Sequence, residues 1–321
     1  MLAYKTAKSA TTLINTQERY KHIRPVPQLP NFAAHIEGLD LSRPLSPEVS
    51  AELRQALDDF EVIFLPPQDI TPERHLELAS VFGPVAQGAY FPRKDGHPQI
   101  EVLANDADHP ASVDHWHADL TWLPNPPAGT VIQITETPEV GGGTAWSSMS
   151  KAFRALSPGL QAYLRDLDAT HTWEVSQWRS YLANLGEDVL INSIRKFKPV
   201  VHPVVWQQAR TGKEFLFVNE TFTRQINGLS GTESRAILSF LAQWIRQPEF
   251  TYTHKWEKGG IAIWDNYATQ HYALADYWPS RRVNQRVTFD LPELTAGTEG
   301  VANTLAAVDG DGRVSKVAYG L

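Results

Sequence analysis

Two histidines and an aspartate in this chain have the residue types and the spacing of a metal site. His117 and Asp119 are two residues apart, and His271 lies far downstream. On a β-strand, residues two apart point to the same face, so one short segment can offer an imidazole and a carboxylate to one ion. Two histidines and one carboxylate on one face of an octahedron leave the opposite face open, which suits non-haem Fe(II) with O₂ and a co-substrate. The pattern therefore predicts an iron oxygenase.

The surroundings of these residues favour a metal role over a chance occurrence. The stretch Trp116–Trp122 has the composition of a β-strand, in which a histidine and an aspartate would be costly to bury without a partner. A metal ion would supply that partner. His115 is a rival ligand, because it lies two residues before His117 and would share its strand face.

Two arginines follow His271 at a spacing that suits anionic guests. Arg282 and Arg286 are four residues apart, so on a strand both face the same side, whereas Arg281 should point outward. A guanidinium forms bidentate hydrogen bonds with carboxylates and sulfonates. Two arginines near a metal site therefore suggest two anionic ligands, and a solvated basic turn is the alternative.

The composition excludes several other functions. The formal net charge is −7, without a run of Lys and Arg, which argues against a nucleic-acid partner. The chain has no cysteine, so a metal must be held by His, Asp or Glu. No apolar stretch reaches the roughly 20 residues that a membrane span needs. The first 24 residues lack the apolar segment of a secretory signal, so we expect a cytoplasmic protein with no membrane contact.

Helix signals occur near the start of the chain and in its second half. Ser46 and Thr71 are each followed by proline, and Ser230 and Glu233 have capping-box spacing. These signals predict helices from about 47 to 60, 72 to 82 and 231 to 245, and weaker helical windows lie at 150–156 and 159–167. The stretch 172–198 should be irregular.

Strand-like runs concentrate around the candidate ligands. They lie at 62–65, 100–103, 130–135, 261–264 and 286–289, with a strand pair at 202–205 and 215–218. This order predicts an α+β chain with a mainly β core, an antiparallel jelly roll (double-stranded β-helix, cupin-like) with helices outside and the metal at its mouth. We expect an N-terminal extension at 1–30 and one domain at 31–321, with a helical or irregular insert at about 150–250.

The motifs resemble the taurine dioxygenase/TfdA family of Fe(II)- and 2-oxoglutarate-dependent oxygenases. The resemblance rests on His117-Ala118-Asp119, on 142–146, and on 264–273 followed by Arg282 and Arg286, and it extends from about 26 to 291. It implies that His117, Asp119 and His271 ligate Fe(II), which leaves His115 a structural role. It also implies that Thr144 and Arg282 hold the distal carboxylate of 2-oxoglutarate and that Arg286 receives the anionic group of the substrate.

The same resemblance implies a reaction and an assembly. With O₂, such an enzyme hydroxylates a small organic anion and releases succinate and CO₂. Where the attacked carbon carries a sulfonate or a sulfate-ester oxygen, the product collapses to an aldehyde plus sulfite or sulfate. A homo-oligomer, dimer or tetramer, is also expected.

Departures from the family pattern bear on the substrate. Family members that use taurine have a histidine shortly after the Phe-Gly pair, and this chain has none shortly after Phe82-Gly83. The asparagine that lies four residues before the first histidine ligand in those members is Val113 here. Tyr267 stands where family members usually have arginine. The first two changes make the pocket less polar, and a free ammonium group would be costly to bury there. We therefore expect a longer or more apolar anion than taurine, such as an alkylsulfonate or alkyl sulfate ester. Tyr90 and Trp122 are candidate pocket walls, although aromatic residues more often serve packing.

Three alternatives stay open at this point. An aryloxyalkanoate, or another carboxylate or phosphonate, could be the substrate of the same chemistry. A zinc hydrolase could use two histidines and an aspartate with a metal-bound water. A non-catalytic jelly-roll binding module would have little reason to keep a complete open-faced set of ligands.

Overall fold

The computed structural model describes residues 12–86, 92–111, 114–176, 179–180, 183 and 186–290. Its largest element is an eight-stranded sheet with the order β1-β2-β3-β14-β6-β16-β5-β4. In that order the strands are β1 (Arg24–Leu29), β2 (Phe32–Glu37), β3 (Val62–Leu65), β14 (Ile261–Asp265), β6 (Gly129–Glu136), β16 (Arg282–Phe289), β5 (His97–Asn105) and β4 (Arg93–Lys94). The pairs are antiparallel except for β2 with β3.

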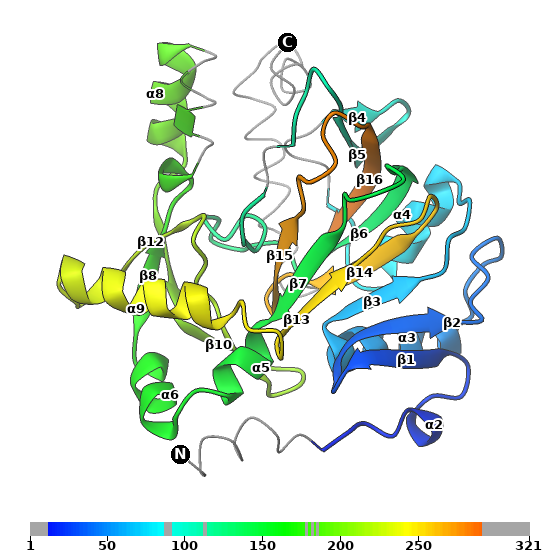
Figure 1. Cartoon of the computed structure of the whole chain (residues 1–321), viewed down its shortest axis with the longest axis horizontal. Helices are drawn as coiled ribbons and strands as arrows, with labels where there is room; N and C mark the ends of the chain where they lie inside the picture. The colour runs from blue at the N-terminus through cyan, green and yellow to red at the C-terminus, as the bar shows by residue number, and fades with distance from the viewer. Residues whose placement is uncertain are drawn as a thin grey trace.

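A three-stranded sheet packs against this large sheet (Figure 1). It consists of β13 (Thr251–His254), β7 (Thr144–Ser148) and β15 (Thr269–Ala273), with β7 in the centre. Side chains from the two sheets interdigitate, and the rings of Phe64 and Trp146 meet edge to face at 5.3 Å between centroids. Because the two sheets enclose a common core, the predicted mainly β jelly roll is confirmed.

Two amphipathic helices cover the outer face of the large sheet. Helices α3 (Pro47–Phe60) and α4 (Pro72–Ser80) each begin after a capping side chain, Ser46 or Thr71, and have proline in the first turn. Their apolar faces pack on Ile63, Ile263 and Val287, which project from the sheet. Both helices were predicted, and the structure confirms them to within two residues at each end.

Between β7 and β13 the chain forms an insert, which lies on the side of the molecule away from α3 and α4 (Figure 1). Its elements are α5 (Met149–Arg154), α6 (Pro158–Arg165), β8 (Asp168–His171), the 3-10 helix η1 (Trp173–Val175), α8 (Glu187–Lys196), β9 (Val200–Pro203), β10 (Val205–Gln207), β11 (Glu214–Leu216), β12 (Thr223–Ile226) and α9 (Gly231–Trp244). The capping box at Ser230 is present as predicted.

Two expectations for the insert were wrong in part. The stretch 172–198 contains α8, whose N-cap is Gly186 without a capping side chain, so the usual start signal is missing. Val205 in β10 pairs with Leu216 in β11, as the predicted strand pair requires, but His202 lies in β9 and pairs with β8 instead.

The N-terminal segment also differs from the expected extension. The short helix α2 (Thr16–Arg19) leads into β1, which pairs with β2 as the edge of the large sheet. Pro25 and Pro27 lie within β1, and an edge strand tolerates proline because one side of it donates no ladder hydrogen bonds. The sheet therefore begins before residue 30, and the rest of the domain division stays a prediction. No described helix combines the length and apolar character of a membrane span.

Candidate metal centre

A single β-bridge brings the distant histidines together. The backbone N–H of His117 donates to the carbonyl of His271 at 3.1 Å, and the N–H of His271 donates back at 2.8 Å. His271 lies in the middle of β15, so the small sheet fixes its position. The imidazole rings then lie side by side, with 4.2 Å between their centroids.

The segment that carries Asp119 is not the strand that the sequence predicted. After the bridge at His117 the chain turns, with Leu120 in the left-handed region at φ 57° and the N–H of Leu123 donating to the carbonyl of Leu120. The buried side chain of Asn266 replaces a strand partner. Its Oδ1 accepts from the N–H of Asp119 at 2.7 Å, and its Nδ2 donates to the Asp119 carbonyl at 2.8 Å. Because the chain turns here, the side chains of His117 and Asp119 reach the same point although the segment is not a strand.

Three ligand atoms converge at this point. Nε2 of His117 lies 3.6 Å from Oδ1 of Asp119, and Nε2 of His271 lies 3.9 Å from the same oxygen. All three ligand atoms lie within 4.8 Å of one another, and each residue is buried. No other group of three such residues was found among the described residues. Two imidazoles and one carboxylate at this separation are the donor set that suits Fe(II).

The protonation states favour metal binding. Nδ1 of His117 lies 2.9 Å from the carbonyl of His115, so it carries the proton and donates, which leaves the lone pair on Nε2. Burial, together with the neighbouring His117, lowers the pKa of His271 well below its ordinary value and keeps it neutral. Burial alone would raise the pKa of Asp119, but Arg286 and the two histidines hold that pKa far below its usual range.

His115 is not one of the converging ligands. Its carbonyl orients His117, and its own ring lies 5.4 Å from the ring of His117 between centroids. Burial and the neighbouring His117 lower its pKa to about 4. The rival ligand therefore has a structural contact with the site, as the family resemblance implied.

Arg282 and Thr144 also meet. Nη2 of Arg282 donates to Oγ1 of Thr144 at 3.3 Å, and Nε1 of Trp256 donates to the same hydroxyl at 2.9 Å. Arg282 is 5% exposed, its Nε has no hydrogen-bond partner, and no acidic side chain pairs with it among the described residues. Burial lowers its pKa, while Tyr277 acts to raise it. A buried cation without a counter-ion is costly, so this position fits an anionic guest.

The glycines before Thr144 make room for Arg282. Gly142 has φ +66°, and a Cβ there would lie 3.3 Å from Cδ of Arg282 and 3.0 Å from Pro138. Its N–H donates to Oδ1 of Asp276 at 2.8 Å. Gly141 and Gly142 therefore have a backbone reason, namely a left-handed turn beside the buried side chain of Arg282.

Arg286 lies against carboxylates of the protein itself. Its Nη2 donates to Oδ2 of Asp119 at 2.8 Å, and its Nε lies 3.5 Å from Oε2 of Glu101, a buried residue of β5. The guanidinium therefore stands directly beside the metal ligands. Arg281 points outward as expected and pairs with Asp106 and Glu136.

Sequence reasoning missed three polar residues here: Asn266, Glu101 and Asn284. Asn284 has the same strand parity as Arg282 and Arg286 and is 2% exposed, and its Oδ1 has no partner. That parity is visible in the sequence and identifies Asn284 as an inward-facing residue. No sequence signal identifies Asn266 or Glu101, because both act across contacts distant in the chain.

The remaining site predictions have different outcomes. Tyr90 lies outside the described residues. Trp122 is 5% exposed in a cluster with Leu123, Trp173 and Phe222, and its ring meets Phe197 edge to face at 5.2 Å. These contacts show packing, and a wall role for Trp122 stays a prediction. Tyr267 stacks on Phe217 and donates to the carbonyl of Pro126 at 2.9 Å, away from the three ligands.

Fold and site together define a jelly-roll protein with a two-histidine, one-carboxylate centre. The family model described as taurine catabolism dioxygenase TauD, TfdA family matches residues 22–288. An alkylsulfatase of Acinetobacter baylyi is 29% identical over 84% of this chain and 85% of the relative. An alpha-ketoglutarate-dependent sulfate ester dioxygenase of Pseudomonas putida is 28% identical over 84% and 89%. The crystal structure of a taurine dioxygenase from Burkholderia xenovorans matches with a TM-score of 0.71 and 30% identity, over 84% of this chain and 91% of that one.

The chain belongs to the TauD/TfdA family, and it is an enzyme of the alpha-ketoglutarate-dependent dioxygenase class. Alpha-ketoglutarate is 2-oxoglutarate, the co-substrate that the sequence resemblance implied. Membership sets aside the zinc hydrolase and the non-catalytic binding module.

Proposed function

We propose that the protein uses Fe(II), 2-oxoglutarate and O₂ to hydroxylate a small organic anion with an apolar body, with an alkyl sulfate ester or an alkylsulfonate as the substrate class. The observation that carries this proposal is the combination of a three-ligand centre with a buried Arg282 that lies beside Thr144 and has no acidic partner among the described residues. One cluster fits a metal ion and the other fits the distal carboxylate of a co-substrate. Their combination is what the family chemistry requires.

The residues divide the work of binding. The imidazoles of His117 and His271 and the ionised Asp119 would hold Fe(II). When bound, the iron supplies the coupling of O₂ reduction and 2-oxoglutarate decarboxylation to oxidation of a C–H bond. Arg282 and Thr144 would bind the distal carboxylate, and the two hydrogen bonds at the Thr144 hydroxyl fix its direction. The ring of Trp264 packs 5.0 Å from that of His271 and helps to exclude water.

Arg286 would bind the anionic head of the substrate. Its hydrogen bond to Asp119 places the guanidinium next to the metal position, so an anion bound there holds the adjacent carbon near the reacting centre. Hydroxylation of a carbon that bears a sulfate-ester oxygen gives an unstable product. The C–O bond breaks, sulfate leaves, and the carbon becomes an aldehyde.

The substrate class rests on the sequence departures and on the relatives. The absent histidine after Phe82-Gly83 and the presence of Val113 remove polar partners for an ammonium group. Two relatives are described as an alkylsulfatase and a sulfate ester dioxygenase, which supports a sulfur-containing anion with an alkyl body. We also expect a dimer or a tetramer, which light scattering measures directly.

Succinate release tests the function. The purified protein is incubated with Fe(II), 2-oxoglutarate and air against a panel of taurine, hexyl sulfate, hexanesulfonate, a phosphonate and an aryloxyacetate. We expect succinate with hexyl sulfate or hexanesulfonate above the substrate-free rate, and none without O₂. Preference for taurine would overturn the substrate class, and absence of O₂-dependent succinate with every compound would overturn the reaction.

A further inference from the structure

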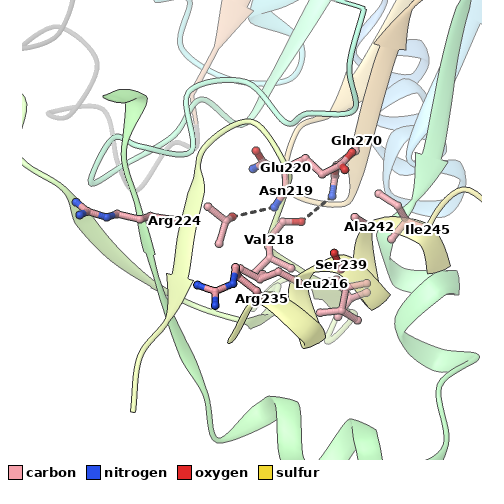
Figure 2. A pocket seen from close by; sticks show the side chains of 13 residues that line it. Leu216, Val218, Asn219, Glu220, Arg224, Arg235, Ser239, Ala242, Ile245 and Gln270 are labelled. Atoms are coloured by element: carbon pink, nitrogen blue, oxygen red, sulfur yellow. Dashed lines mark hydrogen bonds between the residues drawn. The ribbon is translucent and has the colours of Figure 1, made fainter. Parts of the chain in front are cut away.

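A pocket lies on the side of β15 that Gln270 faces, opposite to the side of His271. It has a volume of about 330 Å³, at the lower end of the roughly 300–1,000 Å³ typical of small-molecule sites. Helix α9 forms one wall and the segment 216–224 forms the other (Figure 2). The apolar part of the lining is Leu216, Val218, Leu238, Leu241, Ala242 and Ile245.

The rim of this pocket is positively charged in an otherwise acidic chain. Arg224 from β12 and Arg235 from α9 lie on one side of it, with Ala242 and Ile245 on the other (Figure 2). Neither guanidinium has an acidic partner among the described residues, whereas the lining carboxylate of Glu220 pairs with Arg246. An apolar wall beside two guanidinium groups that have no acidic partner among the described residues matches the tail and head of an amphipathic anion.

A buried glutamine connects the pocket wall to β15. Gln270 lines the pocket and is 2% exposed. Its Nε2 donates to the carbonyl of Val218 at 2.7 Å. Because Val218 also lines the pocket, this hydrogen bond joins the wall to the strand that carries His271.

The pocket wall is hydrogen-bonded to the segments that carry the metal ligands. Gln270 is adjacent to His271 in β15. From the same wall, Asn219 donates to the hydroxyl of Thr121 at 2.9 Å, and Thr221 donates to the carbonyl of Trp116 at 3.3 Å. These contacts flank the His117–Asp119 segment on both sides. A ligand that orders the wall therefore also orders the residues that position the metal ligands.

We propose that this pocket binds an amphipathic organic monoanion, with its apolar chain against α9 and its head group at the rim that carries Arg224 and Arg235, and that occupancy strengthens metal binding at the centre. The binding itself is independent of the proposed function, and only the coupling rests on it. Coupling between two sites is reciprocal, and typical factors are about 5 to 150.

Octyl sulfate, below its micelle-forming concentration, is the probe for binding by calorimetry to the full chain without iron. We expect two sites per chain, one lost in Arg224→Gln/Arg235→Gln and the other lost in Arg286→Gln. Arg195→Gln, an exposed arginine of α8, is the matched control and should keep both sites. Octyl glucoside, which has the same tail and no charge, should not bind to the pocket.

Each other outcome has a definite meaning. A double variant that retains full octyl sulfate binding, or equal binding of octyl glucoside, overturns the pocket proposal. If Arg286→Gln retains every octyl sulfate site of the wild type, the proposed substrate contact is wrong and the pocket proposal stands.

Mn(II) affinity, measured by electron paramagnetic resonance, tests the coupling. Octyl sulfate should tighten Mn(II) binding about fivefold or more in the wild type and not in the Arg224→Gln/Arg235→Gln variant. An unchanged Mn(II) affinity in the wild type overturns the coupling.

Discussion

At the residue scale, the site consists of ligands and of charges that balance them. The convergence of His117, Asp119 and His271, the proposed metal ligands, could be expected from the sequence, because residue type and spacing limit what can bind a metal. The partners of Arg286 could not, since Glu101 and Asp119 reach it across the sheet and not along the chain. Arg282 differs from Arg286 in having no carboxylate beside it among the described residues. This difference identifies Arg282 as the arginine that needs an anionic ligand.

Arg282→Gln should weaken 2-oxoglutarate binding. A hydrogen bond to a charged group contributes about 1.5–3 kcal/mol, so the loss corresponds to roughly 10- to 100-fold in affinity. Anaerobic titration of 2-oxoglutarate into the Fe(II)-loaded protein measures it. Arg281→Gln, which changes the neighbouring exposed arginine, is the control, and equal effects of the two changes would show that only overall charge matters.

At the element scale, the turn after His117 and the end of β14 position the site. The sequence predicted a strand over 116–122 because its residues have high β-propensity, but propensity is overridden here by the side chain of Asn266. The helices that begin with Ser46, Thr71 and Ser230 were predictable because their start signals are local. Helix α8 has no such signal, and its position depends on packing of Leu190 and Ile194 against the Trp122 cluster.

Asn266→Ala should loosen the turn that carries Asp119. The change leaves the backbone N–H and carbonyl of Asp119 without their partners, which should lower the free energy of unfolding by about 1–3 kcal/mol. Fe(II) affinity should fall as well, because the carboxylate loses its fixed position. Urea unfolding and metal titration measure the two effects. Asn192→Ala, at an exposed position of α8, is the control and should change neither the free energy of unfolding nor the Fe(II) affinity. An Asn266→Ala variant with wild-type metal affinity would contradict the role of the Asn266 side chain in positioning Asp119.

Asp265 should make stability depend on pH. Burial raises its pKa to about 6 from an ordinary 3.8, although the N–H groups of Ala268 and Tyr267 act to lower it. The folded state therefore holds this proton more tightly than the unfolded state. The stabilisation is complete below about pH 3.8 and is lost as the pH rises through about 6.

The difference between wild type and Asp265→Asn isolates this contribution. Over that pH window the free energy of unfolding of the wild type should fall, relative to the variant, by up to about 3 kcal/mol. Chemical unfolding at several pH values measures it. Asp166→Asn, at an exposed helix end, is the matched control, and parallel pH curves for wild type and Asp265→Asn would contradict the assignment.

At the scale of the whole molecule, the two sheets position the proposed metal ligands, and the insert is hydrogen-bonded to the segments that carry these ligands. Alternating strands and capped helices were enough to predict the jelly roll and its outer helices. The pairing of β1 at the sheet edge and of β8 with β9 was not predictable, since strand order follows from contacts distant in sequence. The hydrogen bonds between the pocket wall and the segments that carry the proposed ligands were not predictable either, because they join residues distant in sequence.

Fe(II) stoichiometry, measured by equilibrium dialysis without O₂, tests the metal centre most directly. The wild type and Asp114→Ala, which changes a nearby exposed carboxylate, should each bind one Fe(II) per chain. Asp119→Ala should bind none while keeping the circular dichroism of the folded protein. If Asp119→Ala instead binds Fe(II) as tightly as the wild type, the three side chains are not the metal ligands and the account of this site is wrong.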